Sequence, residues 1–287
     1  MRSEEVMMDL ILDFARADER VRAVIMNGSR VNPDAPRDRF QDYDIVYLVT
    51  SVDDYVRDRS WISYFGELMI IQTPDEMEVP APGENSDGKF AFLMQFIDGN
   101  RIDLTMFPVQ KMANMQQDSL SKLLLDKDEI IPPLPPASSK DYLTQPPTSQ
   151  QFEHCCNEFW WVSTYIVKGL WRRELSYAKF MFDGPVRDML MKMLNWHIAI
   201  RSDFKADPGK LGKYFEKHLE PKHWAAFAAT YCDADYENIW RSLYVMTSLF
   251  REIAQVVAAF FDYTYPHEDD RRVTEYFNQI RNLPQDA

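Results

Sequence analysis

The sequence predicts an α+β protein of two dissimilar parts, a β-sheet with flanking helices followed by an all-α bundle. In the first 135 residues, runs rich in β-branched and aromatic residues are bounded by turn-forming residues, as in strands. Six prolines then fall within positions 132–147, where they remove backbone donors and restrict their neighbours. After them, apolar residues recur at helical spacing. We therefore expect domains over residues 1–135 and 148–287, joined by a Pro-rich connector at 136–147.

The elements of the first part follow in order. Residues 4–17 carry apolar side chains at helical spacing, with Ser3 in the N-cap position. Strands are expected at 21–26, 43–50, 67–72, 90–97 and 101–107. The last two flank Asp98-Gly-Asn100, a strong hairpin signal. Residues 73–89 are typical of an exposed acidic excursion, and Pro108 is expected to open a helix that ends near Leu125.

The second part is expected to hold about five helices. Thr148-Ser-Gln-Gln151 predicts a capping box at the start of a long helix. Glycine and proline indicate helix breaks near residues 183–185, 207–209, 220–221 and 265–266.

The composition restricts the class of partner. A net charge of −13 argues against nucleic acid, which needs clustered Lys and Arg, and suits a cationic small molecule. Three cysteines, two of them adjacent, form neither a disulfide framework nor a zinc pattern and fit a reducing cytoplasm. The apolar run 244–261 is interrupted by Arg251 and Glu252, short of a membrane span. We expect a cytoplasmic protein with no membrane or nucleic-acid partner.

The first candidate site is the turn Asn27-Gly28-Ser29, which ends an apolar run. Gly28 lets the backbone turn sharply beside a ligand, and the backbone amides with the Ser29 hydroxyl suit a phosphate group. Arg30 follows directly and is placed to reach a triphosphate. An ordinary turn is the alternative interpretation of Gly28-Ser29 alone.

Three acids form the second candidate site. Asp42 and Asp44 project from one face of a strand because side chains alternate. Asp103 stands alone among apolar residues of another strand, and a neighbouring position would bring it to the other two. Clustered carboxylates need a compensating cation, and Mg²⁺ takes oxygen ligands while keeping positions open for phosphates. The pattern predicts a two-metal phosphoryl-transfer site.

Together these motifs resemble the nucleotidyltransferase fold of the polymerase β type, and the whole chain resembles the aminoglycoside 6-adenylyltransferases, a streptomycin-modifying family. The residues that carry the resemblance are Asn27–Arg30, Gln41–Ile45, Asp98–Leu104, Trp160–Val162 and Leu170–Lys179, and it extends from near the start to about residue 280. It implies a nucleotidyltransferase domain with a mixed sheet, ATP as co-substrate with two Mg²⁺ ions, and AMP transfer to a streptomycin hydroxyl.

The resemblance also directs attention to the helical part. It places a triphosphate-binding lysine at Lys179, which is otherwise an ordinary solvated lysine. Glu174 and Asp183 are spare acids able to pair with cationic substrate groups or accept a proton. The three tryptophans of this stretch suit the core or a domain interface, or they stack on a guanidinium-bearing sugar. They are Trp160, Trp161 and Trp171.

The mechanism this implies is attack of the substrate hydroxyl on the α-phosphorus of ATP. Asp103 is one candidate for the general base, and a separate Glu or Asp is the other. Two further functions remain open: adenylylation of a protein side chain or another small molecule, and non-catalytic nucleotide binding as a partner protein. A nucleic-acid polymerase is disfavoured by the charge.

Overall fold

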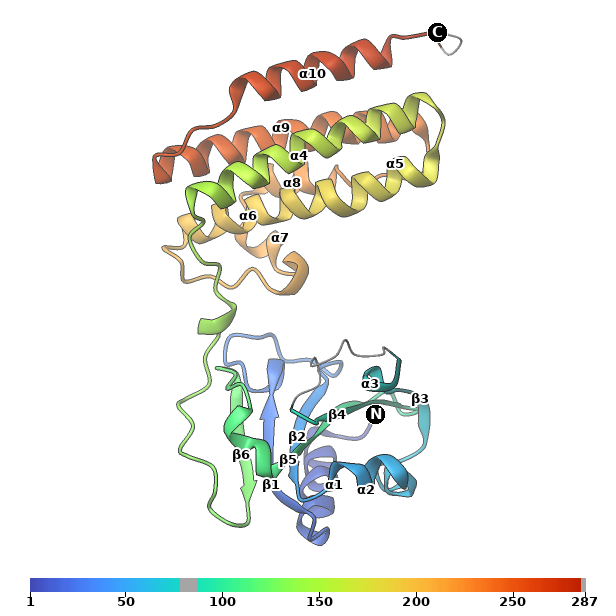
Figure 1. Cartoon of the computed structure of the whole chain (residues 1–287), viewed down its shortest axis with the longest axis vertical. Coiled ribbons are helices and arrows are strands. Elements are labelled where there is room, and N and C mark those ends of the chain that lie inside the picture. Colours follow the sequence, from blue (N-terminus) through green and yellow to red (C-terminus); the bar gives the residue numbers. More distant parts are fainter. Residues whose placement is uncertain (78–86, 285–287) are drawn as a thin grey trace. The chain divides into compact units, whose positions relative to one another are not determined.

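The structure of the protein is a computed structural model, which describes residues 1–77 and 87–284. The chain divides into two compact units, Met1–Asp141 and Tyr142–Ala287, and the division falls inside the Pro-rich stretch 132–147. The first unit contains the sheet and the second is helical (Figure 1). The predicted α+β class is confirmed.

A six-stranded mixed sheet forms the first unit, in the order β3-β4-β5-β2-β1-β6. Its strands are β1 (Val21–Asn27), β2 (Tyr43–Val49), β3 (Leu68–Gln72), β4 (Phe90–Phe96), β5 (Arg101–Pro108) and β6 (Ser121–Asp126). The neighbours β2 and β5 are parallel, and the other neighbouring pairs are antiparallel. The predicted hairpin joins β4 to β5, with Gly99 at a positive φ.

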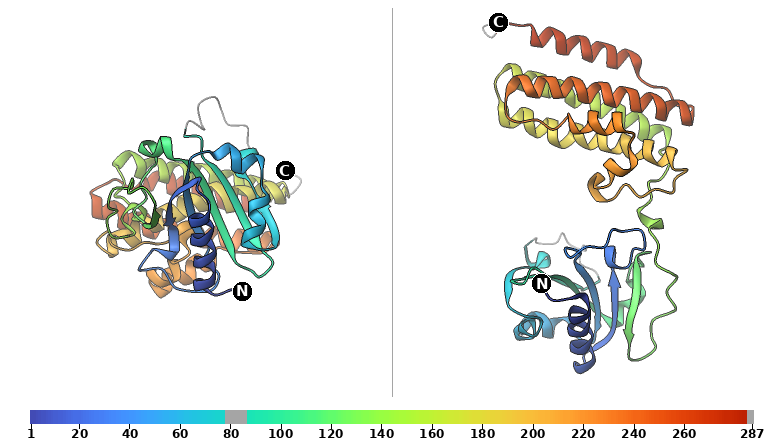
Figure 2. Two further views of the ribbon diagram at one scale, coloured as in Figure 1. Left: turned by 90° about the horizontal axis from the view of Figure 1, so that it is seen from below. Right: turned by 180° about the vertical axis from the view of Figure 1, so that it is seen from behind.

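Helices cover one face of this sheet. They are α1 (Glu4–Ala17), α2 (Val52–Arg57) and the 3-10 helix η2 (Ser60–Phe65), whose apolar side chains pack with the alternate residues of the strands. Figure 2 shows α1 lying along the strands. Ser3 accepts a hydrogen bond from the Val6 amide, so the predicted N-cap is confirmed. The short helix α3 (Pro74–Met77) opens the expected acidic excursion, of which residues 78–86 lie outside the described part of the chain.

The opposite face carries only a small apolar cluster, centred on Ala23, Leu48 and Phe107. Several positions on this face are polar, among them Asn27, Asp44 and Asp103. A sheet with one covered face and one open face leaves a surface on which polar groups can meet a ligand.

The helix expected over 108–125 is wrong. β5 continues to Pro108, the 3-10 helix η3 (Val109–Asn114) follows, and Ser121–Asp126 forms β6 against the free edge of β1. Leu and Lys favour helices only weakly as intrinsic propensities, and the hydrogen-bonding edge of β1 outweighs that preference. β6 thereby becomes the last strand before the connector.

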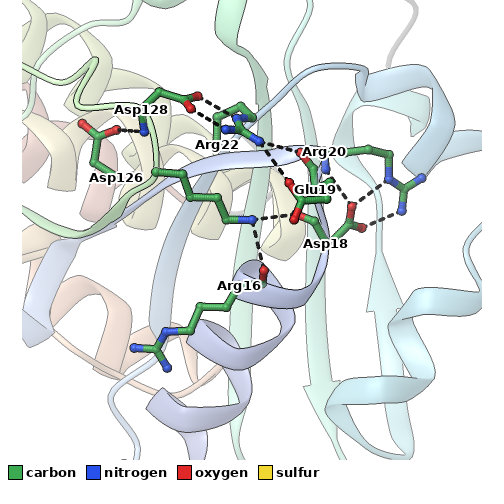
Figure 3. Close-up of polar contacts among 8 residues, drawn as sticks. Arg16, Asp18, Glu19, Arg20, Arg22, Asp126 and Asp128 are labelled. Atoms are coloured by element: carbon green, nitrogen blue, oxygen red, sulfur yellow. Dashed lines mark hydrogen bonds and ion pairs between the residues drawn. The ribbon is translucent and has the colours of Figure 1, made fainter.

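A polar cluster fastens β6 to the turn between α1 and β1 (Figure 3). Arg22 pairs with Asp128 and reaches Glu19, while Arg20 pairs with Asp18. The Lys127 ammonium donates to the carbonyls of Arg16 and Asp18, at 3.2 and 3.0 Å. These contacts lie at the end of β1 remote from Asn27, so they serve the fold rather than the site.

The second unit is a helical bundle. Its α-helices are α4 (Ser149–Trp171), α5 (Leu175–Met181), α6 (Arg187–Arg201), α7 (Phe215–His218), α8 (Pro221–Ala228), α9 (Tyr236–Phe261) and α10 (His267–Arg281). The predicted capping box is confirmed, since Thr148 and Gln151 exchange side-chain and backbone hydrogen bonds. The core is centred on α4, α6 and α9 (Figure 1). Within it, the rings of Phe159 and Phe250 stack at 3.6 Å between centroids.

Two expectations for this unit are wrong. The described residues form seven α-helices rather than about five, because α7 and α8 are short and a turn at 172–174 separates α4 from α5. The break expected at 183–185 is a π-helix, η5 (Phe182–Val186), that joins α5 to α6 without interruption. Pro185 has no amide to donate, and the wider π turn accommodates it inside the helix.

α9 meets the length and composition of a membrane span, although its apolar run 244–261, interrupted by Arg251 and Glu252, was expected to fall short of one. Half of the apolar stretch of α9 is buried inside the unit. Arg251, in the middle of the helix, pairs with Asp270 of α10. Both features are those of the core helix of a bundle.

Candidate active site on the open face of the sheet

Gly28 determines how close the backbone comes to the acids. It follows β1, begins the 3-10 turn η1 (Gly28–Arg30), and has a φ of +75°. A Cβ on this residue would lie 2.1 Å from Asp44 Oδ2, far inside contact distance. Its amide donates to the Leu120 carbonyl at 3.1 Å, which ties the turn to the residue before β6. Glycine is therefore required here by both conformation and space.

The Gly28 amide is thus already bonded and is not a spare donor for phosphate. Ser29 accepts a hydrogen bond from Gln41 Nε2 at its carbonyl (3.1 Å), and its hydroxyl has no partner among the described residues. The part of the expected phosphate cradle that remains available is the Ser29 side chain.

Arg30 is buried, with 4% of its side chain exposed. It donates to the carbonyls of Gln41 (2.7 Å) and Asp42 (3.1 Å), and its guanidinium lies 3.7 Å above the Tyr43 ring. It also pairs with Glu4 at 3.3 Å. These contacts hold the chain that enters β2, so Arg30 positions Asp42 in this conformation rather than reaching outward.

The three acids lie together on the open face. Asp44 of β2 and Asp103 of β5 are direct partners in the parallel register, and Asp42 precedes Asp44 by two residues on the same face. Burial raises the pKa of Asp44 to about 6, with further increases from Asp103 and Asp42. Burial also raises the pKa of Asp42, partly offset by Arg101. Raised carboxyl pKa values in a cluster are typical of a site that needs a cation.

Arg101 supplies the positive charge found among them. Its Nε and Nη2 each lie 2.7 Å from one oxygen of Asp103, and Nε lies 3.6 Å from Asp42 Oδ2. Arg101 was not among the predicted site residues. Its i, i+2 spacing from Asp103 on a strand was the available signal, because that spacing puts both side chains on one face.

The acids suit Mg²⁺ in type and number, since hard divalent cations take carboxylate oxygens. In the described residues, however, no three His, Cys, Asp or Glu side chains converge closely enough to form a ready metal cluster. The guanidinium of Arg101 lies between Asp42 and Asp103, at the position where a cation is needed. The donors fit a metal in type and number, and in this structure Asp42 and Asp103 are paired with Arg101.

A cavity of about 810 Å³ opens on the same face of the sheet. Its floor comes from the next residues of that face, including Ile25, Val46 and Thr105, and its wall from residues 114–121. This volume lies within the range of small-molecule sites. Ser121 Oγ donates to Asn27 Oδ1 at 2.8 Å, which fixes one polar side chain at the edge between the cavity and the acids.

The other candidate residues belong to the helical unit. Lys179 pairs with Asp183 (2.8 Å) and lies 3.3 Å from the Cys232 carbonyl, while Arg187 also pairs with Asp183 (3.0 Å). Asp183 is therefore already neutralised by two cations. Glu174 is exposed at the N-cap position of α5 and has no ion pair within the described residues.

The three tryptophans separate into different environments. Trp160 is buried, 2% exposed, with its ring against Phe159 and Phe250, so it takes the core position that was one interpretation of these tryptophans. Trp161 is 61% exposed, and its Nε1 donates to the Tyr165 hydroxyl. Trp171 is partly exposed and donates to the Leu283 carbonyl.

Comparison with known proteins identifies the family. The sequence model of the family described as streptomycin adenylyltransferase matches residues 1–280. The chain belongs to this family. The streptomycin adenylyltransferase family thus accounts for both units, not the sheet alone, and the chain is a nucleotidyltransferase.

Individual members of the family match over nearly the whole chain. An aminoglycoside 6-adenylyltransferase of Bacillus subtilis (strain 168) is 39% identical over 98% of each chain. One from Campylobacter jejuni is 40% identical over 94% of this chain and 93% of its own. A crystal structure of an aminoglycoside 6-adenyltransferase from Bacillus subtilis is 36% identical, with a TM-score of 0.48, and covers 99% of this chain and 100% of its own.

Proposed function

We propose that the protein transfers AMP from ATP to a hydroxyl of an aminoglycoside, with the 6-hydroxyl of streptomycin as the first choice of acceptor, and releases pyrophosphate. The observation that carries this proposal is the register of Asp44 against Asp103, with Asp42 on the same face and Gly28 packed against Asp44. The family supports the class of reaction, and the relatives' name supports the class of acceptor.

The three carboxylates are the residues that would hold two Mg²⁺ ions. Bound there, the metal would neutralise phosphate charge and orient the α-phosphorus for in-line attack. Asp42 and Asp44 are placed by β2, while Arg30 fixes the backbone just before it. Ser29 offers its hydroxyl to a phosphate oxygen, and Lys179 remains a candidate for a further phosphate contact.

The proton of the acceptor hydroxyl must pass to a carboxylate. Asp103 is our candidate for the base; both its oxygens accept hydrogen bonds from Arg101, and opening of this pair would clear them for the acceptor hydroxyl. A separate acid remains the alternative base. The cavity beside the acids offers room for part of a substrate on the reacting side of the sheet.

For the acceptor we propose contacts with Glu174 and with the exposed rings of Trp161 and Trp171. Streptomycin carries guanidinium groups, which pair with carboxylates and stack on aromatic faces. The net charge of −13 favours the approach of a cation, and the cysteine content fits a cytoplasmic enzyme. Asp183 is a weaker candidate because Lys179 and Arg187 already neutralise it.

The test is incubation of the protein with labelled ATP, Mg²⁺ and a panel of aminoglycosides, with products identified by mass spectrometry. We expect a mass increase of one AMP on streptomycin and release of pyrophosphate, both lost in Asp44→Asn. AMP on a different aminoglycoside would retain the reaction and replace the acceptor. AMP on a protein or no transfer at all would contradict the proposal.

A further inference from the structure

We propose that Arg101 is an exchangeable counter-ion. In the absence of metal it neutralises Asp103 and Asp42, it leaves Asp103 when a metal binds there, and it then pairs with a phosphate of the nucleotide. This inference rests on the proposed function, because it requires that the acids bind metal and ATP.

The geometry makes Arg101 and a metal direct competitors. Each oxygen of Asp103 lies 2.7 Å from a different guanidinium nitrogen, so neither oxygen is free of the arginine. A metal held by Asp103 would use the same oxygens. Metal binding therefore brings a divalent cation against the guanidinium and disfavours its charge-assisted hydrogen bonds to Asp103.

Arg101 is also free to leave, in contrast to Arg30. Its side chain is 38% exposed, and within the described residues its guanidinium contacts only Asp103 and Asp42. Arg30 is 4% exposed, stacks on Tyr43 and bonds two backbone carbonyls, so its release would open the chain before β2. Of the two arginines beside the acids, only Arg101 can move without loss of backbone contacts.

The exchange couples the two ligands. When metal binds alone, Arg101 loses its two hydrogen bonds to the Asp103 carboxylate and has no new anionic partner. When metal arrives with a triphosphate, the same planar fork gains phosphate oxygens, which it binds in the same bidentate manner. Metal and nucleotide therefore strengthen each other's binding, and by linkage the effect is equal in both directions.

The experiment is calorimetric titration of Mn²⁺ into the full-length protein, with and without an ATP analogue that has a methylene group between the α- and β-phosphates. Arg101→Gln is compared with Arg57→Gln, which makes the same charge change at an exposed position at the end of α2 in the same unit. We expect Arg101→Gln to tighten Mn²⁺ binding alone by about tenfold and to weaken the analogue in the presence of Mn²⁺ by a similar factor. Arg57→Gln should change neither.

Unchanged or weaker Mn²⁺ binding in Arg101→Gln overturns the exchange, and an unchanged affinity for the analogue overturns the phosphate contact. If the parent transfers AMP while Arg101→Gln titrates like the parent, only this inference fails. If the parent binds neither Mn²⁺ nor analogue, the proposed function fails with it. Should Arg101→Gln not fold, Arg101→Lys makes the same test with a smaller tightening, because lysine retains charge but has no planar fork.

Discussion

Two arginine–aspartate pairs in this protein have the same bidentate geometry and opposite surroundings. In the helical unit, Arg251 holds Asp270 while the hydroxyls of Tyr265 and Thr274 bond the same carboxylate. The Asp270 side chain is 7% exposed, and each of its two carboxylate oxygens accepts two hydrogen bonds. In the sheet unit, Arg101 holds Asp103 beside two further acids and on an open face. The first pair is closed and structural, whereas the second has unbalanced negative charge around it.

The difference teaches how to separate a functional ion pair from a structural one. A buried pair with every lone pair used has nothing left to offer a ligand, and its loss leaves an uncompensated charge. A pair flanked by carboxylates with raised pKa values has negative charge around it that a further cation could neutralise. Substitutions at the two pairs should therefore affect different properties, activity at one and stability at the other.

The largest effect is expected at Asp44, which lies beside the open pair of Arg101 and Asp103. Asp44→Asn should lower AMP transfer by about a thousandfold or more, because loss of a metal ligand removes several kcal/mol of transition-state stabilisation. Its Tm should stay the same or rise, since the substitution removes repulsion among three like charges. Steady-state transfer assays and thermal unfolding in the presence of a chelator measure both. Normal turnover at saturating Mg²⁺ would end the metal-site proposal.

The closed pair should show the reverse. Asp270→Asn leaves Arg251 without its counter-ion and should lower the free energy of unfolding by about 3 kcal/mol. Denaturant unfolding gives this value, and transfer activity measured well below Tm should be nearly that of the parent. A change below about 0.5 kcal/mol, the size seen for exposed pairs, would remove the distinction between the pairs.

Gly28→Ala tests how closely the backbone must approach the open site. The new Cβ would lie 2.1 Å from Asp44 Oδ2, so the carboxylate has to move, and misplacement by about 1 Å commonly lowers turnover on the order of a hundredfold. The positive φ adds roughly 1–2 kcal/mol of strain. Activity and unfolding are compared with Gly184→Ala, where no atom lies within 4 Å of the added carbon. Equal activity in the two variants would contradict the prediction.

Acidification should affect the two units with opposite signs. The folded pKa of Asp44, about 6, lies above its ordinary value, so its burial penalty is present above pH 6 and fades as pH falls. Burial lowers the pKa of His197 to about 4, so the folded state loses stability as pH falls from about 6.5. Each effect is on the order of 1–2 kcal/mol between pH 7 and 5.

Unfolding of metal-free parent, Asp44→Asn and His197→Gln at both pH values separates these contributions. The parent should gain stability relative to Asp44→Asn at pH 5 and lose it relative to His197→Gln. Parallel pH profiles for parent and variant would refute the assignment at that residue.

The smallest effect concerns the acceptor. Glu174→Gln should weaken streptomycin binding about tenfold with ATP affinity unchanged, since a guanidinium loses its carboxylate partner. Asp183→Asn should instead destabilise the fold by breaking its pairs with Lys179 and Arg187. Calorimetry with each ligand and thermal unfolding distinguish the two variants. Equal loss for both ligands in Glu174→Gln would assign that acid to the fold.

Local signals made much of the fold predictable. The Ser3 N-cap, the Thr148–Gln151 capping box and the Asp98–Asn100 hairpin each depend on a few neighbouring residues, and each is confirmed. The placement of Asp103 beside Asp44 was also expected, because an unpaired carboxylate among apolar residues of a strand is costly unless other polar groups surround it. The two caps and the hairpin could be predicted because all the residues that form each of them lie within one short stretch of chain.

The errors share a different cause. The helix expected over 108–125 rested on Pro108 as a helix start, and only the distant edge of β1 makes Ser121–Asp126 a strand. Trp160 could not be distinguished from Trp161 by spacing alone, since the bundle decides which neighbour turns inward. The contact of Arg101 with Asp42 depends on the pairing of β5 with β2, which the sequence around Arg101 does not indicate.

The bond between the Gly28 amide and the Leu120 carbonyl has a consequence for the order in which the site is completed during synthesis. Gly28 is synthesised ninety-two positions before its partner, which is made together with the strand that lines β1. A nascent chain that ends before β6 can form α1 and the β4–β5 hairpin, but its glycine turn lacks that anchor. The glycine turn is thus fastened by one of the last parts of its unit to be made.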